Sequence, residues 1–358
     1  MDFKSKHEYL RYVIKEYIKD NGLRPGSKLP TENEFQQQYD VSRHTVRLAL
    51  SNLENEGIIY KEQGLGSFVA DPSSKKKLKE IGVITTYISD YIFPYIIRGI
   101  ETEISKSGYS MILMSTNNDR DLEKKAVQMM LERNVDGLIV EPTKSAYYNH
   151  NIGMYLKLKE YGIPTIMINA KYDEIDISSV MTDDYHSGFI AVKELVDNHH
   201  TNIGGIFKID DRQGKERLKG YMAACYEFGI EYNSDNIIVY ETETMQSTMH
   251  NEVNAMIKEA RVTGIVCYND KIANDLLDII FENGYSIPKD FSIVSHDNSY
   301  ISSLRTSLIS SVEHPKDELG KKAAQLIIDS IENGADISED YIFDTHLVRR
   351  TSVRKLED

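Results

Sequence analysis

The sequence has few of the residues that mark secreted, metal-binding or membrane-spanning proteins. It contains two cysteines, Cys225 and Cys267, no tryptophan and only eight prolines in 358 residues. Two cysteines so far apart match neither the CxxC spacing of a zinc site nor the clusters of a disulfide scaffold, so we expect buried thiols and no metal. No run approaches the roughly 18 apolar residues of a membrane span, and the start, MDFKSKHEYLRYVIKEYIKD, is too charged for a signal peptide. These absences predict a cytoplasmic protein without membrane contact.

Motifs that mark common enzymes are missing as well. The sequence has no GxxxxGK[ST] phosphate loop, no GxSxG nucleophile turn and no HExxH metal pair. An enzyme such as a sugar kinase, isomerase or hydrolase is therefore not supported by any identifiable catalytic residue. We expect a protein that is not an enzyme and needs no cofactor.

The charge of the chain is unevenly distributed. The net charge is -14, yet residues 1–70 carry as many basic as acidic side chains, and the excess of acid lies after residue 80. Such asymmetry leaves the first segment free to face phosphate while the remainder stays acidic. With 358 residues and 41% hydrophobic content, the chain is long enough for two or three domains with separate cores.

The first 70 residues follow the pattern of a winged helix-turn-helix. Apolar residues at helical spacing predict a first helix over 9–18, which ends at Asn21-Gly22. Thr31 and Glu34 have the spacing of a capping box and start a short second helix. Ser42 caps a third helix, and the tight Asp40-Val41 connection makes the pair a helix-turn-helix. Residues 58–70 read as two short strands around Gly64-Leu65-Gly66, a hairpin that forms the wing.

Beyond a polar, lysine-rich linker at 71–80 the pattern changes. Helical runs such as AVQMMLERN alternate with apolar strand-like runs, which are GVITTYI, SMILMST, DGLIVEP, PTIMINA, NIGGIFKI, GIVCYND, FSIVSHD and LISSVEH. Alternation of this kind predicts parallel sheets covered on both faces. Residues 81–358 exceed what one open sheet needs, so we expect an α/β fold of two doubly wound lobes facing a cleft. We place lobe one at about 81–200 and 301–330, and lobe two at about 201–300 and 331–358.

Both parts resemble known families. The segment KLPTENEFQQQYDVSRHTVRLALSNLENEGIIYKEQGLGSFVA resembles the reader of GntR-type regulators. The remainder resembles the LacI/GalR effector domain in FPYIIRGIETEISKSGY, DGLIVEP, VMTDDYHSG, RLKGYMAACYEFGI, YNDKIANDLLDII, IPKDFSIVSHDN and LVRRTS. The resemblance implies a sequence-specific repressor that binds double-stranded operator DNA as a homodimer. The hinge helix of ordinary LacI/GalR members is absent, which leaves the route of signalling open.

The resemblance and the exposed face of the third helix together suggest the DNA contacts. Arginine pairs bidentately with guanine, and histidine donates to a base edge or phosphate. Residues of the wing tip are similar to phosphate or minor-groove contacts of the family, and Lys28 and Glu32 are expected to touch the backbone or orient the arginines. The predicted DNA-binding residues are Lys4, Lys28, Glu32, Arg43, His44, Thr45, Arg47, Gln63, Gly66 and Ser67.

Polar residues that follow the apolar strands suggest the effector site, because an open α/β sheet presents its ligand there. Arg217 occupies the RxxG position at which the family implies a contact to a sugar hydroxyl, and Phe93 offers an aromatic face. The predicted effector-binding residues are Tyr91, Phe93, Glu141, Asp184, Arg217, Asn269, His296 and Asp297.

Several carboxylates with one arginine suit the neighbouring hydroxyls of an uncharged polyol and would repel a phosphate. The sequence therefore favours a free small sugar, and L-arabinose is implied by resemblance alone. A purine or another small metabolite remains an alternative effector. A transport-type binding protein shares the two-lobed fold, but it would need an export signal and would not carry a winged helix.

Overall fold

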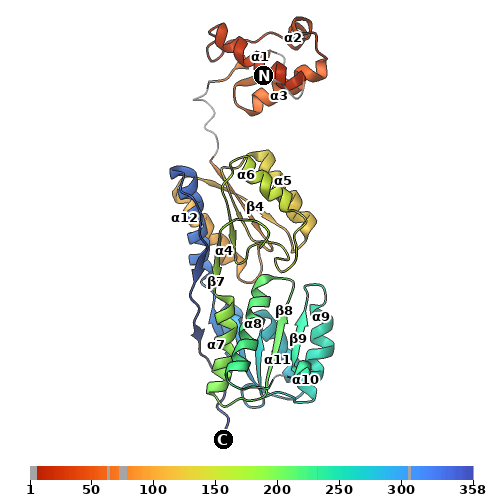
Figure 1. The fold of residues 1–358 in the computed structure, drawn as a ribbon, viewed down its shortest axis with the longest axis vertical. Coiled ribbons are helices and arrows are strands. Elements are labelled where there is room, and N and C mark those ends of the chain that lie inside the picture. Colours follow the sequence, from red (N-terminus) through yellow and green to blue (C-terminus); the bar gives the residue numbers. More distant parts are fainter. Residues whose placement is uncertain (1–5, 63–64, 72–78, 232, 305–307, 358) are drawn as a thin grey trace. The chain divides into compact units, whose positions relative to one another are not determined.

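The computed structural model describes residues 6–62, 65–71, 79–231, 233–304 and 308–357. The chain divides into two compact units, Met1–Leu78 and Lys79–Asp358 (Figure 1).

The first unit is a winged helix. Helices α1 (Lys6–Asp20), α2 (Glu32–Tyr39) and α3 (Arg43–Asn55) precede the antiparallel hairpin of β1 (Ile59–Glu62) and β2 (Gly66–Val69). The predicted caps are confirmed, since Thr31 and Glu34 form a capping box on α2 and the Ser42 side chain accepts a hydrogen bond from the Thr45 amide on α3. Apolar side chains from all three helices and the hairpin meet in one core that includes Leu10, Ile14, Phe35, Leu50, Leu53 and Ile59.

The second unit consists of two lobes, each built on a six-stranded sheet (Figure 1). The sheet of lobe one has the order β13-β7-β6-β5-β3-β4, and its neighbouring strands are all parallel. The strands are β3 (Glu80–Thr85), β4 (Ser110–Ser115), β5 (Gly137–Val140), β6 (Thr165–Ile168), β7 (Ser179–Thr182) and β13 (Tyr341–Phe343). Two cores pack against this sheet. One contains side chains of α4 (Phe93–Lys106) and α12 (Lys316–Asn333), and the other contains side chains of α5 (Arg120–Arg133) and α6 (Ile152–Glu160).

The sheet of lobe two has the order β14-β12-β11-β10-β8-β9, with only β14 antiparallel. The strands are β8 (Ile203–Lys208), β9 (Ile237–Tyr240), β10 (Gly264–Cys267), β11 (Ser292–Asp297), β12 (Ser310–Glu313) and β14 (Leu347–Val348). One core contains α7 (Asp184–Asp197) and α8 (Arg212–Glu227). The other contains α11 (Asp270–Glu282) and the helical segment α9 (Met245–Thr248), η2 (Met249–Val253) and α10 (Asn254–Lys258). Single turns η1 (Ser234–Asn236) and η3 (Tyr300–Ser303) complete the lobe.

Helices α7 and α8 pack with their backbones almost in contact. A Cβ atom on Gly188 would lie 2.0 Å from the Arg217 carbonyl oxygen, and one on Gly220 would lie 1.9 Å from the Tyr185 carbonyl oxygen. Only glycine permits this approach. The two glycines therefore hold Arg217 of α8 close to the start of α7.

Three segments belong to the lobe opposite to the one we expected. Helix α7 and strand β12 were predicted in lobe one but lie in lobe two, whereas β13 was predicted in lobe two but pairs with β7 in lobe one. Each segment lies next to a point where the chain passes between the lobes. Strand and helix periodicity is a local signal, and it does not show which of two similar sheets a strand joins.

The chain passes between the lobes three times, and these crossovers lie side by side. The first is at Asp183, the second at His314-Pro315 and the third at 344–346. The Asp183 amide donates to the Phe343 carbonyl at 3.1 Å, and the Glu313 amide donates to the His346 carbonyl at 2.8 Å. Any change in the angle between the lobes must therefore turn all three segments together.

Candidate functional site

The exposed face of α3 carries two arginines that share one carboxylate. Glu32, at the start of α2, accepts a hydrogen bond from Arg47 Nε at 3.1 Å and another from Arg43 Nε at 3.4 Å. The arginine side chains remain 63% and 60% exposed, so their outer nitrogens face solvent. Burial works to raise the pKa of Glu32, but the hydrogen bonds and charges of Arg47 and Arg43 outweigh it and lower the pKa. Glu32 is therefore ionised, and it binds both guanidinium groups through their Nε atoms.

The other predicted residues of the winged helix are spread around this face. His44 and Lys28 are exposed, whereas Thr45 is bound to the helix cap through a 2.8 Å contact with Ser42 Oγ. Gly66 has a φ of +117°, which suits glycine, and Ser67 is largely buried, its carbonyl accepting from the Leu29 amide. Predicted residues Lys4 and Gln63 lie outside the described part of the chain.

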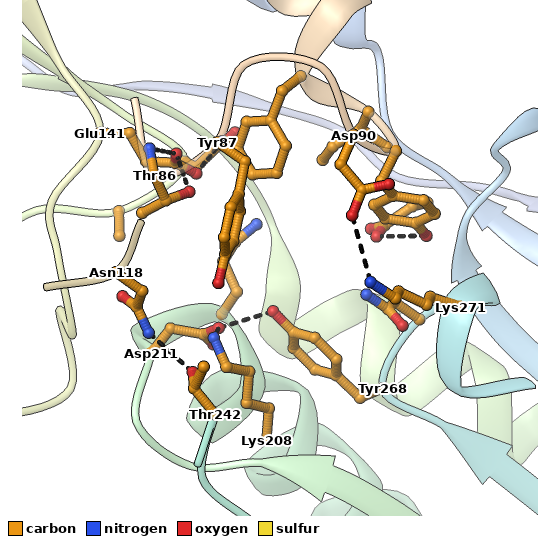
Figure 2. A pocket seen from close by; sticks show the side chains of 18 of the residues that line it. Thr86, Tyr87, Asp90, Asn118, Glu141, Lys208, Asp211, Thr242, Tyr268 and Lys271 are labelled. Atoms are coloured by element: carbon orange, nitrogen blue, oxygen red, sulfur yellow. Dashed lines mark hydrogen bonds and ion pairs between the residues drawn. The ribbon is translucent and has the colours of Figure 1, made fainter. Parts of the chain in front are cut away.

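A cavity of about 240 Å³ lies between the two lobes. Figure 2 shows the side chains around it, with Thr86, Asn118 and Glu141 reaching in from lobe one and Lys208, Asp211 and Tyr268 from lobe two. Most of these residues follow the carboxyl ends of parallel strands, which is where open α/β sheets bind ligands. Direct bonds between the lobes close its margins, including Asn118 Nδ2 to Thr242 Oγ1 at 2.8 Å and Lys271 Nζ to Asp90 at 3.2 Å.

Five of the eight predicted effector residues line this cavity: Tyr91, Phe93, Glu141, Asn269 and Asp297. The ring of Phe93 lies edge-to-face with Tyr87 at 5.5 Å, so the wall has an aromatic corner. Asn269 also caps α11 by accepting from the Ile272 amide. Tyr91, on lobe one, donates through Oη to Asp297 Oδ2 on lobe two at 2.8 Å.

The other three, Asp184, Arg217 and His296, are not among the residues that line the cavity in this structure. Arg217 is 3% exposed, and each of its side-chain nitrogens donates to protein: Nε to Asp184 Oδ1 at 2.8 Å, Nη1 to the Tyr268 carbonyl at 2.7 Å and Nη2 to Asp297 Oδ1 at 3.0 Å. The imidazole of His296 is bound through Nδ1 to the Cys267 carbonyl at 2.8 Å. These residues lie one layer behind the wall. A buried guanidinium is stable only when charged or hydrogen-bonding partners surround it, and here the protein itself supplies them.

Glu141 is a buried carboxylate whose hydrogen-bond donors, within the described part of the chain, are all neutral. Oε2 accepts from the Thr86 amide at 2.8 Å and from Thr86 Oγ1, and Oε1 accepts from Asn169 Nδ2 at 2.9 Å. Burial raises the pKa of Glu141, although the hydrogen bonds from Thr86 and Asn169 oppose the change. The neutral donors thus hold the carboxylate in one orientation at the cavity wall.

Lys208 brings a positive charge to the opposite wall, and sequence reasoning missed it. Its Nζ lies 3.0 Å from Asp211 Oδ2 and 3.3 Å from Asp210 Oδ1, while Asp211 accepts from Tyr268 Oη at 2.7 Å. Burial works to lower the pKa of Lys208, but the charges of Asp211 and Asp210 raise it, so the ammonium group stays charged. Lys208 ends a predicted strand, and the rule that found Glu141 would have found it too. Other lining residues that we missed include Thr86, Tyr87, Asp90, Asn118, Asn169, Tyr240, Thr242 and Lys271.

The described residues give no sign of metal or membrane chemistry. No group of three or more His, Cys, Asp or Glu among them is arranged to hold a metal ion. None of the helices within the described ranges has the length and apolar character needed to cross a bilayer.

Comparisons with known proteins agree with this two-part architecture. The model of the gntR family of bacterial regulatory proteins matches residues 10–69, and that of a periplasmic binding protein-like domain matches residues 192–353. Two solved structures match the larger part with 26% identity and a TM-score of 0.67. One is the transcription regulator CcpA of Lactococcus lactis, covering 77% of this chain and 99% of its own. The other is a LacI family transcriptional regulator from Enterococcus faecium with bound ribose, covering 78% and 100%.

Relatives of known role match over nearly the whole length. An arabinose metabolism transcriptional repressor of Halalkalibacterium halodurans is 43% identical over 97% of this chain and 96% of its own. A repressor of the same name from Geobacillus stearothermophilus is 40% identical over 98% of both chains. The protein belongs to this family of transcriptional repressors of sugar metabolism and is a regulator rather than an enzyme.

Proposed function

We propose that this repressor binds operator DNA through the winged helix and leaves it when a free small sugar, with L-arabinose as the first candidate, occupies the cavity between the lobes. The observation that carries the effector proposal is the composition of the cavity wall. Carboxylates, amides and phenols from both lobes surround a small space with an aromatic corner at Phe93 and Tyr87. Such groups pair with the hydroxyls of a sugar, while an aromatic ring packs against its apolar face.

The charge of the wall favours an uncharged ligand. Four carboxylates line the cavity, on Asp90, Glu141, Asp211 and Asp297, against the two ammonium groups of Lys208 and Lys271. Both ammonium groups are already paired, with Asp211 and Asp90 respectively. A phosphate group would meet net negative charge, so we favour a free sugar over a sugar phosphate. A volume of about 240 Å³ is small for a ligand site and suits a monosaccharide.

For DNA we propose that Arg43 and Arg47 read base edges and that Glu32 orients them. Lys4, Lys28, His44, Thr45, Gln63, Gly66 and Ser67 are proposed as further contacts to the backbone or the bases. One winged helix offers few base contacts, so we propose a homodimer bound to a two-fold symmetric operator in the cytoplasm.

Calorimetric titration of the full chain tests the effector. The panel contains free pentoses and hexoses, including L-arabinose, their phosphates, and purine bases as the alternative class. We expect saturable binding of a free monosaccharide and none of its phosphate. Binding of a purine alone would make the alternative effector correct, and tighter binding of a phosphate would contradict the charge argument.

A matched pair of variants ties the binding to this cavity. Phe93→Ala removes an aromatic ring from the wall, whereas Phe281→Ala removes an exposed ring from α11. Loss of the stacking surface should raise the sugar Kd about tenfold, which corresponds to about 1.4 kcal/mol. The Phe281 variant should bind like the unmodified protein. Equal affinities for both variants would place the ligand elsewhere.

A further inference from the structure

The second crossover contains a buried histidine that is linked to the cavity. His314 is 1% exposed, and its Nε2 lies 3.1 Å from Asn169 Oδ1. Burial lowers the pKa of His314 to about 3, so the imidazole is neutral at neutral pH. Asn169 uses Nδ2 to donate to Glu141 Oε1 at 2.9 Å, so its Oδ1 is the acceptor and His314 Nε2 carries the proton. A directed chain of hydrogen bonds thus runs from His314 through Asn169 to the carboxylate of Glu141.

Asn169 is held in an unusual backbone conformation. It follows β6 with a φ of +64°, a region that asparagine tolerates better than most side chains. Its amide side chain offers both a donor to Glu141 and an acceptor for His314. An aspartate there would place a second negative charge beside Glu141. The residue therefore fits the role of a link between two fixed partners.

Lys316, two residues after His314, makes the corresponding link to lobe two. Its Nζ donates to the Asp297 carbonyl at 2.6 Å and to the His314 carbonyl at 2.9 Å. Asp297 has a φ of +88°, so its backbone needs support to keep its carboxylate in place. Glu141 and Asp297 line the cavity from opposite lobes. The carboxylate of Glu141, through Asn169, and the backbone carbonyl of Asp297 are both linked to the same short segment, His314–Lys316.

We propose that His314 and Lys316 are positioning residues that couple occupation of the cavity to the angle between the lobes. The proposal rests on the proposed function, in which the cavity takes the sugar. The bonds of both residues exist in the arrangement seen here, with the lobes closed around the cavity. An opening that moves Glu141 away from Asp297 must turn the backbone at 314–315 and strain or break these bonds. They therefore stabilise the closed arrangement, to which the sugar binds and the operator binds poorly.

The test uses His314→Phe, which keeps a ring but removes the donor to Asn169. For each protein, operator affinity is measured by fluorescence anisotropy with and without saturating L-arabinose, and sugar affinity by calorimetry. The ratio of the two operator affinities is the coupling factor. We expect the coupling factor to fall at least tenfold and the sugar Kd to rise similarly, because both depend on the stability of the closed arrangement. Operator affinity without sugar should stay equal or rise, because loss of the bond disfavours the arrangement that binds the operator poorly.

Two further variants separate positioning from simple packing. His314→Gln restores an N–H donor toward Asn169 and should keep the coupling factor within about threefold of the unmodified protein. His346→Phe changes an exposed histidine of the third crossover and should behave as the unmodified protein does. A coupling factor in His314→Phe equal to that of the unmodified protein overturns the proposal. So does a loss in His314→Gln as large as that in His314→Phe.

Lys316→Met tests the proposal if circular dichroism and thermal melting show that His314→Phe does not fold. It removes the donor to the Asp297 carbonyl but keeps the length of the side chain, and we expect a tenfold or greater loss of coupling. An unchanged coupling factor in this variant then contradicts the proposal. If neither L-arabinose nor any other sugar of the panel changes the operator affinity of the unmodified protein, the proposed function itself is wrong. This outcome differs from a failure of the positioning proposal, in which the unmodified protein responds to sugar and the variants respond equally.

Discussion

Arg217 holds the carboxylate of Asp297 from behind the cavity wall, with Nη2 3.0 Å from Oδ1. Its Nε donates to Asp184 Oδ1 at 2.8 Å. The other carboxylate oxygen of Asp297, Oδ2, accepts a hydrogen bond from Tyr91 Oη of lobe one. All three charged groups are nearly inaccessible to water. One buried cation thus serves two buried carboxylates, and the position of Asp297 depends on a residue that does not line the cavity.

Replacing Arg217 should be costly for stability. Arg217→Met leaves Asp184 and Asp297 buried without their cation, and we expect the free energy of unfolding at pH 7 to fall by about 3–5 kcal/mol. The matched control is Arg212→Met, because Arg212 pairs with the largely exposed Asp173 and should contribute less than about 1 kcal/mol. Urea denaturation measures both. Similar small losses in the two variants would contradict the buried network.

The acid stability of the protein should depend on its buried histidines. Burial lowers the pKa of His296 to about 4 and that of His314 to about 3, against about 6.5 in an unfolded chain. Below pH 6.5 each of these histidines is protonated in the unfolded chain but stays neutral in the folded chain. The free energy of unfolding therefore decreases as the pH falls, by up to about 1.4 kcal/mol per pH unit for each histidine. Above pH 6.5 this contribution to stability is fully present.

The variant His314→Gln isolates one of the two contributions. Between pH 6 and pH 5 the stability of the variant should fall less steeply than that of the unmodified protein, by about 1.4 kcal/mol per pH unit. Denaturant unfolding at a series of pH values gives both curves. Parallel curves would mean that His314 is already protonated in the folded protein.

Glu32 should govern discrimination between DNA sequences more than affinity for DNA. Glu32→Gln weakens the bonds to Arg43 and Arg47 and removes one negative charge from the proposed DNA-binding face. We expect affinity for a random duplex to stay equal or rise, while the preference for the operator falls about tenfold. Anisotropy titrations on both duplexes at one salt concentration measure the ratio. An unchanged ratio would make Glu32 a helix-terminus charge with no orienting role.

The arginines themselves should carry the sequence preference. Arg43→Ala and Arg47→Ala should each weaken operator binding by about 1–3 kcal/mol and relax base preference. Arg11→Ala is the control, because Arg11 lies on α1 and pairs with Glu56. Equal losses on operator and random duplexes would identify Arg43 and Arg47 as phosphate contacts.

Local signals in the sequence were sufficient for much of the fold. The Thr31 and Ser42 caps, the helices of the winged helix and all eight predicted strands of the lobes are present in the structure. These features depend on residues close together in the chain. The strands that we missed are β9, β13 and β14, and the last two are only three and two residues long, too short for a clear pattern.

Long-range features were harder to predict. The three partners of Arg217 come from α7, β11 and the loop after β10, and their meeting depends on the packing of α7 on α8. Lys208, by contrast, was missed although the rule for strand ends applies to it and its partners Asp210 and Asp211 lie two and three positions further along the chain. The link from His314 to Glu141 joins residues 145 and 28 positions apart, beyond any local pattern.

In the proposed mechanism, sugar and operator favour different arrangements of the same chain. The most direct measurement is a reciprocal titration of the unmodified protein, with operator affinity determined at zero and saturating L-arabinose, and sugar affinity determined without and with saturating operator. Linkage requires that the sugar weakens operator binding and the operator weakens sugar binding by the same factor, which we expect to exceed about tenfold. An operator affinity that L-arabinose leaves unchanged, or tightens, would contradict the account.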